Sequence, residues 1–388
     1  MSTKGEFVTY PVGQGLFYAG KLNIDKIKKK EFNFIYDCGS NHFGADGHLM
    51  KSITEYKTSF NLTKVIDMLV ISHLDRDHLS GLKELAKETT IKRIFLPYIK
   101  NLDIKLFSYV LKTLLYYKVI SEETKVILIN GLVNGNPKND DSLSLPSLEK
   151  LESKASKFNI KLDLGGLENS LKILEFNETR FQLFDWLFDF YNYPLPKDEI
   201  LSIKSSFEEF IKRNKIKKFE DFINCMEFWI PFSKTVYLEN IKKDNFMNDN
   251  NNLSLCLMHA PLQVLEYKEA SATLLTGDLD LNKEVIYKGF NSKYSYILEK
   301  LKVFFLPHHG SRKNWNEKLV WSYCNNTLSI ITSGSNYEHH PDFEVISKIF
   351  LSKNDFLSIT EKFDSYKYII DTKNLNLSKS IGKKSSLK

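Results

Sequence analysis

The feature that most constrains this chain is a cluster of ionisable side chains at residues 73–78, directly after an apolar stretch. Residues 65–71 are mostly apolar and rich in β-branched types, which predicts a buried strand. The pattern at residues 79–87 predicts a short helix. The cluster therefore lies in a loop at the end of a strand, where proteins usually place their chemistry. Its four candidate metal ligands are His73, Asp75, Asp77 and His78.

The spacing of these four residues allows them to act together. In an extended loop, residues two apart point the same way, so His73, Asp75 and Asp77 can converge. His78 then points elsewhere and can join Asp77 on a second ion. Imidazole suits zinc, whereas carboxylates favour harder ions such as manganese or magnesium. We expect two divalent ions, zinc first. A solvated polar turn is the alternative, but apolar strands rarely end in such a cluster by chance.

Further predicted strands run into residues of the same kind, at 272–278, 302–307 and 328–334. Asp278 ends the first of these, and a carboxylate there could bridge two ions. Asp37 follows a predicted strand near the N-terminus and could help to position the loop at residues 73–78, which we call the metal loop. A turn-forming aspartate is equally expected there. Together these strand ends predict one rim of a two-sheet structure with a metal pocket. The histidines after the other two strands are His308, His309, His339 and His340, of which His308, His309 and His340 are candidates.

The order of predicted elements indicates an α/β chain with an insertion. Strands and helices alternate over residues 1–99 and again over residues 251–373. Between them, at residues 100–250, apolar residues recur at helical spacing. We therefore expect an inserted, mainly helical subdomain that supplies no imidazole ligand and could cover the site or grip substrate. Residues 374–388 are rich in serine and lysine, which predicts a flexible tail.

Composition bounds the function only loosely. The chain has 388 residues, of which 42% are hydrophobic, enough for a full core. Its net charge of +6 permits an acidic partner such as nucleic acid but does not require one. The four cysteines form no C-x-x-C pair and are expected to be reduced thiols. With no apolar signal segment and no long apolar run, we expect a soluble cytoplasmic protein outside the membrane.

The order of motifs resembles the metallo-β-lactamase superfamily, whose fold is an αββα sandwich of two similar halves. The cluster at residues 73–78 looks like the superfamily signature H-x-H-x-D-H, with Asp75 in place of the second histidine. This variant is similar to the metallo-hydrolase domain of bacterial competence DNA-uptake channel proteins (ComEC-type). The resemblance covers about residues 6–98 and 250–372, and the insertion and the lack of a membrane channel are departures from it. Other similar segments are Val12-Gly13-Gln14-Gly15, Asp37-Cys38-Gly39, Asn252-Leu253-Ser254, Thr276-Gly277-Asp278, Pro307-His308-His309-Gly310-Ser311 and His340-Pro341.

The resemblance implies ligand assignments. His73 and Asp75 would bind one ion, Asp77 and His78 the other, and Asp278 would bridge them. One of His308 and His309 would bind the second ion, and the resemblance does not decide which. The superfamily usually gives the first ion a further histidine from the region between the cluster and the bridging aspartate, where only His259 lies. Because His259 lies on a predicted strand, we expect it in the core or at the surface, with water, Asn252 or Ser254 completing the first site.

The resemblance also implies a function, a metal-dependent hydrolase of phosphodiesters and above all a DNA or RNA nuclease. Asp77 and Asp278 could orient a metal-activated water. A phosphodiesterase of a small nucleotide or other phosphoester is an alternative, as is a degenerate, non-catalytic partner protein. Lysines of the insertion could follow a nucleic-acid backbone, or form an ordinary solvated helix face. His340 is expected either as a catalytic residue that contacts the substrate or transition state, or as part of a structural turn. The substrate contacts that we expect are Asn252, Ser311 and Arg312, and the lysines are Lys212, Lys215, Lys217 and Lys218.

Overall fold

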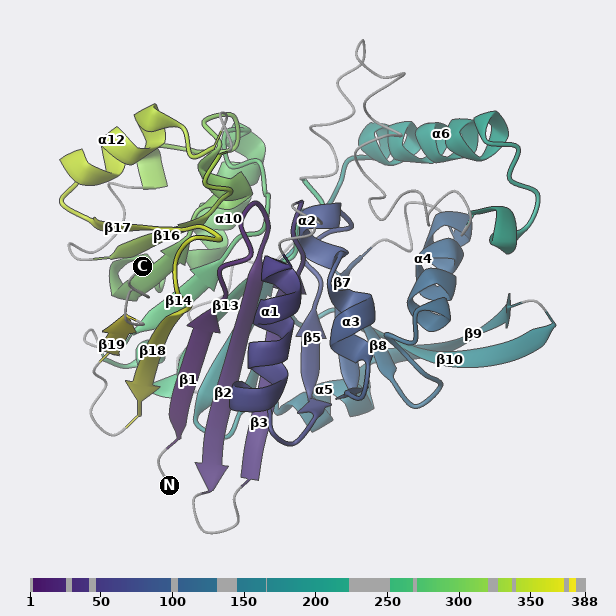
Figure 1. Ribbon diagram of the computed structural model, residues 1–388, viewed down its shortest axis with the longest axis horizontal. Helices are drawn as coiled ribbons and strands as arrows, with labels where there is room; N and C mark the ends of the chain where they lie inside the picture. The colour runs from purple at the N-terminus through teal and green to yellow at the C-terminus, as the bar shows by residue number, and fades with distance from the viewer. Residues whose placement is uncertain are drawn as a thin grey trace.

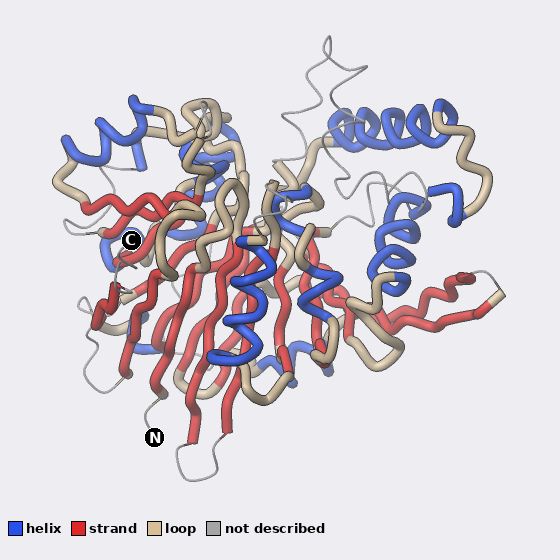
Figure 2. The backbone as a smooth tube through the Cα atoms, viewed as in Figure 1, coloured by secondary structure: helices blue, strands red, loops and turns tan. Residues whose placement is uncertain are grey.

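Two large mixed β-sheets form the centre of this mixed α/β protein (Figure 1, Figure 2). Among the residues that the structure describes, the first sheet has ten strands and the second has seven. A small third sheet pairs β4 (Val65–Ile66) with β6 (Thr90–Ile91). The computed structural model of the chain describes residues 3–25, 30–41, 47–98, 104–130, 145–164, 166–222, 252–267, 271–319, 327–336, 340–372 and 377–381.

The first sheet joins strands from both ends of the chain. Its β1, β2, β3 and β18 pair antiparallel, and β3, β5, β7, β8 and β10 pair parallel. In spatial order its strands are β19 (Leu377–Ile381), β18 (Tyr366–Asp371), β1 (Lys4–Thr9), β2 (Phe17–Asp25), β3 (Lys30–Cys38), β5 (Met68–Val70), β7 (Arg93–Pro97), β8 (Lys125–Ile129), β10 (Leu167–Phe176) and β9 (Ser156–Leu164).

The second sheet contains the later strands that precede candidate ligands. Its strands β14 to β17 pair parallel, and β11 to β14 pair antiparallel. In spatial order the strands are β11 (Arg180–Leu183), β12 (Trp186–Tyr191), β13 (Cys256–Pro261), β14 (Ala272–Leu275), β15 (Leu301–Phe305), β16 (Leu328–Thr332) and β17 (Asp355–Ile359).

Apolar side chains form three layers, one between the sheets and one on the outer face of each. Phe34 and Val70 of the first sheet lie in the middle layer with Leu257 and Val303 of the second. The outer layers pack against helices. The order is therefore helices, sheet, sheet, helices. The helices of the first outer layer are α1 (His48–Glu55), α3 (Leu82–Ala86), α4 (Ile104–Tyr116) and α6 (Lys197–Arg213), and those of the second are α10 (Glu284–Tyr294) and α12 (Phe343–Leu351).

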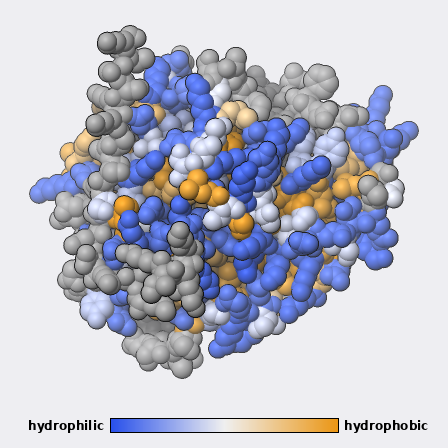
Figure 3. Space-filling model, turned by 60° about the horizontal axis from the view of Figure 1, so that its bottom comes forward, coloured by the Kyte–Doolittle hydropathy of each residue, from blue (hydrophilic) through white to orange (hydrophobic). Residues whose placement is uncertain are grey.

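Successive residues of the first sheet's strands point to opposite faces, and both faces are buried. Along β3, Phe34 and Tyr36 face the middle layer, whereas Ile35 faces the helices. Along β5, Leu69 faces the helices and Val70 the middle layer. Strands that are buried on both faces read as continuous apolar runs, as residues 65–71 do. The surface seen in Figure 3 is mostly hydrophilic, with hydrophobic side chains in smaller separate areas.

The segment at residues 100–250 differs from the expectation of a mainly helical insertion. Helices α4 and α6 are present, but the described residues also contain five strands, β8 to β12. Strand β8 pairs with β7 in the first sheet and β12 pairs with β13 in the second, so the segment continues both sheets. The prediction is wrong for residues 125–191. Strands β8 and β12 are short apolar runs without alternation, whereas β9 alternates polar and apolar residues, a strand signal that the prediction overlooked. Residues 223–250 lie outside the described residues.

The chain end also differs from the expectation. Residues 377–381, predicted as part of a flexible tail, form β19, which pairs antiparallel with β18. Residues 374–376 and 382–388 lie outside the described residues.

Cys38 and Cys256 are buried free thiols, as predicted for two of the four cysteines. Among the helices that the structure describes, none combines the length and apolar character needed to cross a bilayer.

Candidate metal centre

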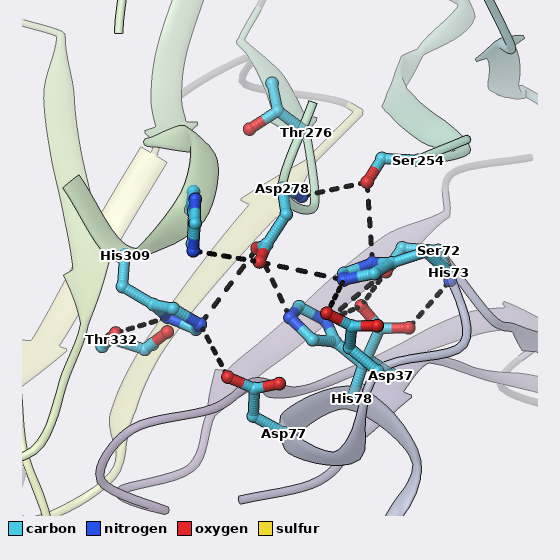
Figure 4. Close-up of polar contacts among 12 residues, drawn as sticks. Asp37, Ser72, His73, Asp77, His78, Ser254, Thr276, Asp278, His309 and Thr332 are labelled. Carbon is cyan, nitrogen blue, oxygen red and sulfur yellow. Dashed lines mark hydrogen bonds and ion pairs between the residues drawn. The ribbon is translucent and has the colours of Figure 1, made fainter. Parts of the chain in front are cut away.

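The ends of strands from both sheets bring the candidate ligands together (Figure 4). Asp37 lies at the end of β3, and the loop after β5 carries His73. Asp278 follows β14, and the short helix η4 (Pro307–Gly310) after β15 carries His309. The helix α2 (Arg76–Leu79) holds Asp77 and His78 in its first turns. The sequence predicted this convergence, and in the structure these side chains surround one buried pocket.

Glycines allow the metal loop to pack against the N-terminal loops. A Cβ atom on Gly39 would lie 2.5 Å from the backbone of Asp77 and His78. A Cβ on Gly15 would lie 2.7 Å from the carbonyl oxygen of Asp77, and the φ of Gly15 is +151°. Real Cβ atoms do not approach backbone so closely, so these two positions require glycine. The motifs around Gly15 and Gly39 therefore support the loop that carries Asp77 and His78.

Three buried imidazoles direct their Nε2 atoms at carboxylates. The Nε2 of His73 lies 3.6 Å from Asp278 Oδ2, and the Nε2 of His78 lies 3.3 Å from Asp278 Oδ1. The Nε2 of His309 lies 3.3 Å from Asp77 Oδ2. These three Nε2 atoms are buried and have no hydrogen-bond partner. Two ligands about 2.1 Å from one tetrahedral ion stand roughly 3.4 Å apart, so the separations fit a shared cation.

Hydrogen bonds at Nδ1 fix the orientation and tautomer of each ring. The Nδ1–H of His78 donates to Asp37 Oδ2 at 2.7 Å, and that of His309 donates to the Thr332 carbonyl oxygen at 2.8 Å. The Ser72 hydroxyl donates to Asp37 Oδ2 at 2.6 Å, which leaves its oxygen to accept from His73 Nδ1 at 2.9 Å. In a neutral ring with Nδ1 protonated, Nε2 carries a lone pair. Lone pairs that face carboxylate oxygens favour a cation between them, either a proton or a metal ion.

The ligand atoms form two compact groups that share His78. One group is His73, His78 and Asp278, and the other is Asp77, His78 and His309, with all five residues buried. Asp278 lies between the groups, since its Oδ2 faces His73, whereas its Oδ1 faces His78 and lies 4.0 Å from His309 Nε2. Asp75 is near the first group, with its Oδ2 3.7 Å from His73 Nε2. The buried His and Asp side chains thus form a pocket whose residues fit metal binding.

His308 lies outside both compact groups. Its Nε2 is 3.7 Å from Asp278 Oδ2, its side chain is 30% exposed, and its Nδ1 contacts Asn314 Oδ1 at 2.7 Å. Asn314 Nδ2 in turn donates to the Asp278 carbonyl oxygen at 2.9 Å. The ring of His340 lies 5.2 Å from that of His308. Sequence left His308 and His309 as alternatives for one ligand position, and the geometry brings His309 into a group with Asp77 and His78.

Burial and charge shift the pKa values of the pocket strongly. Burial, together with Asp77 and Asp278, raises the pKa of Asp75 to about 8. Burial also raises that of Asp77, but the close contact with His309 and the charge of His78 outweigh it and lower the pKa to about 2. Burial lowers the pKa of His73 to about 3. Burial lowers the pKa of His78 as well, but Asp278 and Asp37 raise it well above its ordinary value. The carboxylates therefore compete for the available positive charge, which a metal ion would supply.

Polar residues that the sequence analysis did not single out complete the surroundings of the ligands. Asn41 Nδ2 donates to Asp77 Oδ2 at 2.7 Å, and the Asn41 backbone N–H donates to the Gln14 carbonyl oxygen at 2.6 Å. The Gly334 N–H donates to Gln14 Oε1 at 3.4 Å, which links this loop to the end of β16. Ser72 could have been suspected from its place next to His73. Asn41, Asn314 and Thr332 carry no comparable signal, because their contacts arise only from the fold.

The other predicted residues have different surroundings. Asn252 is buried and its Nδ2 donates to Glu199 Oε2 at 3.2 Å. Ser254 Oγ accepts from the Asp278 N–H at 3.0 Å and lies 3.4 Å from His73 Nδ1. Ser311 is buried in the turn after His309, and Arg312 is exposed and pairs with Glu344 at 2.8 Å.

His259 lies between the two sheets, far from any ligand role. Its Nε2 lies 2.7 Å from Tyr18 Oη, and its ring stacks on Phe7 with 4.6 Å between centroids. The expectation of a core histidine is therefore confirmed for His259. Neither of the two compact ligand groups contains it.

No protein-family model matches the chain, and no curated protein matches it significantly. The case for a function consequently rests on the geometry of the pocket.

Proposed function

We propose that this protein is a metal-dependent hydrolase of phosphodiester bonds, and that its substrate is DNA or RNA. One observation carries the proposal: three buried imidazoles, each held at Nδ1, aim unpartnered Nε2 atoms at the carboxylates of Asp77 and Asp278. A polar pocket of this kind is costly unless cations occupy it. The layer order of helices and two sheets supports an αββα sandwich of the metallo-β-lactamase type.

The residues would divide between two ions. Asp77, His78 and His309, with Oδ1 of Asp278, would hold one ion, a set of two imidazoles and two carboxylates. His73 and Asp75, with Oδ2 of Asp278, would hold the other, where carboxylates outnumber imidazoles. Zinc suits the first set, whereas the second also suits manganese or magnesium. When bound, the ions would lower the pKa of a water molecule and offset negative charge on the phosphoryl oxygens.

The chain's own residues would orient this chemistry. Asp37 accepts hydrogen bonds from His78 and from the Ser72 hydroxyl and N–H, so it fixes two parts of the metal loop at once. Asp278, only 3% exposed, can orient the nucleophile towards phosphorus. His308 and His340 lie together beside Asp278, where a phosphate oxygen or leaving group would stand. Positioning of this kind supplies much of the catalysis in phosphoryl transfer.

A substrate panel tests the proposal. Purified protein is incubated with labelled single- and double-stranded DNA, RNA, cyclic dinucleotides and bis-p-nitrophenyl phosphate, each under zinc, manganese and magnesium. We expect cleavage of a polynucleotide in at least one metal, and loss of cleavage in Asp278→Asn. The exposed Asp364→Asn is a matched control that removes one carboxylate elsewhere. Absence of hydrolysis with every substrate and metal, in protein shown to bind metal, would contradict the proposal.

A further inference from the structure

Helix α6 runs from the metal centre towards a basic surface. Near its start, Glu199 accepts a hydrogen bond from Asn252, two residues before Ser254, which contacts His73 Nδ1 at 3.4 Å. The helix has 17 residues and is therefore about 25 Å long. Figure 1 shows that it extends along one edge of the molecule, away from the centre of the sheets. Its far end is thus separated from the pocket by about the length of the helix.

The far end of α6 carries exposed lysines. Four lysines within seven residues are exposed, and none has an ion-pair partner in the part of the chain that the structure describes. The nearby acidic groups are partly engaged, since Glu209 pairs with Arg213, and Asp221 accepts the backbone N–H groups of the turn. The cations are thus available to an outside partner. They are Lys212, Lys215, Lys217 and Lys218.

An exposed aromatic ring lies beside these lysines. Tyr116, at the end of α4, is 47% exposed, and its ring centroid lies 6.3 Å from that of Phe219. Phe219 also lies under the ammonium group of Lys112 at 5.4 Å. Buried Ile216 and Phe222 anchor the turn, which keeps the lysines between them on the outside. We call Tyr116 together with the four lysines the α6-end patch.

We propose that the α6-end patch binds the backbone of a single-stranded nucleic acid whose scissile phosphate lies at the metal centre. The inference rests on the proposed function and makes it more specific, since it selects a polymer over a small phosphodiester. Lysines supply cations for phosphates, and an exposed ring offers a platform on which a base can stack. At roughly 3.4 Å per stacked nucleotide, a strand must be about seven nucleotides or longer to reach from the pocket to the patch.

Charge removal tests the patch directly. The variant with Lys215, Lys217 and Lys218 all changed to alanine is compared with wild type by fluorescence anisotropy, using a labelled 20-nucleotide single strand in EDTA. We expect Kd to rise at least tenfold at 50 mM salt. The slope of log affinity against log salt should fall by about 2, since each phosphate contact on a single strand contributes about 0.7. Tyr116→Ala should weaken binding without changing this slope, because stacking releases no counterions.

Matched controls separate this inference from the function it rests on. The triple change of Lys150, Lys154 and Lys157 to alanine removes the same charge around α5 (Leu148–Lys154) and β9, elsewhere on the molecule, and should leave binding unchanged. All variants should hydrolyse bis-p-nitrophenyl phosphate at the wild-type rate, and strands of four nucleotides should be cleaved equally by patch and control variants. Equal loss of 20-nucleotide binding in both triple variants would overturn the patch. Hydrolysis of the small ester without any polynucleotide binding would refute nucleic-acid binding by the patch but would still show a hydrolase. Polynucleotide binding without any hydrolysis would refute the proposed function alone.

Discussion

The metal pocket and the interior between the sheets each contain a fully buried histidine, but their surroundings are opposite. His78 contacts Asp37 at 2.7 Å and Asp278 at 3.3 Å, and these carboxylates raise its pKa well above normal despite burial. His259 hydrogen-bonds to the Tyr18 hydroxyl and is surrounded by aromatic rings, and burial lowers its pKa to about 3. The first environment favours positive charge, whereas the second excludes it.

The comparison shows that burial alone does not mark a functional histidine. A buried imidazole becomes a ligand when its Nδ1 is held by an acceptor and its Nε2 faces a second carboxylate, as in His78. His259 also has one nitrogen hydrogen-bonded, but aromatic rings such as those of Phe34 and Trp186 surround it. Substitutions in the pocket should therefore change metal affinity, and substitutions in the interior should change stability.

The largest expected effect in the pocket comes from Asp278→Asn. An amide removes the charge shared by His73 and His78, so the variant should lose more than 100-fold in metal affinity, beyond the range of residues that only support ligands. Metal titration of the purified protein measures this, with circular dichroism to establish folding. Metal content equal to that of the wild type would show that Asp278 does not bind the metal.

Asp37→Asn should have the next largest effect. Asp37 touches no proposed ion but accepts three hydrogen bonds, from His78 Nδ1 and from the Ser72 hydroxyl and N–H. Loss of such support typically costs 10–100-fold in metal affinity. The same change at exposed Asp364 is the control. If metal affinity stayed within twofold of wild type, the orientation of His78 would not depend on Asp37.

The sequence predicted the ligand rim well because its signals are local. Short apolar strands that each end in His or Asp can be recognised one at a time, and parallel neighbours place such ends together. Asn41 and Thr332 could not be found this way, since each contacts a ligand more than twenty residues away through tertiary packing alone. Strand β12 was missed for a related reason: all six of its residues are buried, so it shows no alternation.

In the interior, the lowered pKa of His259 should make the folded protein less stable in acid. Its pKa is about 6.5 when unfolded and about 3 when folded, so between these values the unfolded chain binds a proton that the folded chain does not. The free energy of unfolding should therefore be unaffected above pH 6.5 and fall by about 1.4 kcal/mol per pH unit below it, towards pH 3. Urea unfolding in EDTA at pH 7 and pH 5 measures this. His259→Gln should show a shallower dependence than wild type, and an equal slope in both proteins would refute the prediction.

The smallest expected effect is that of Asn41→Ala, which tests whether the two ligand groups of the pocket bind metal independently. Asn41 donates one hydrogen bond to Asp77 Oδ2, the same oxygen that lies 3.3 Å from His309 Nε2. Without it, Asp77 keeps its charge but can rotate away, so the ion of the Asp77, His78 and His309 group should bind about tenfold more weakly. The ion near His73 should be unaffected, because Asn41 contacts no residue of that group. Two-step metal titration resolves the difference: weakening of only one step supports two separable sites, whereas equal weakening of both would mean that the pocket binds its cations as one unit.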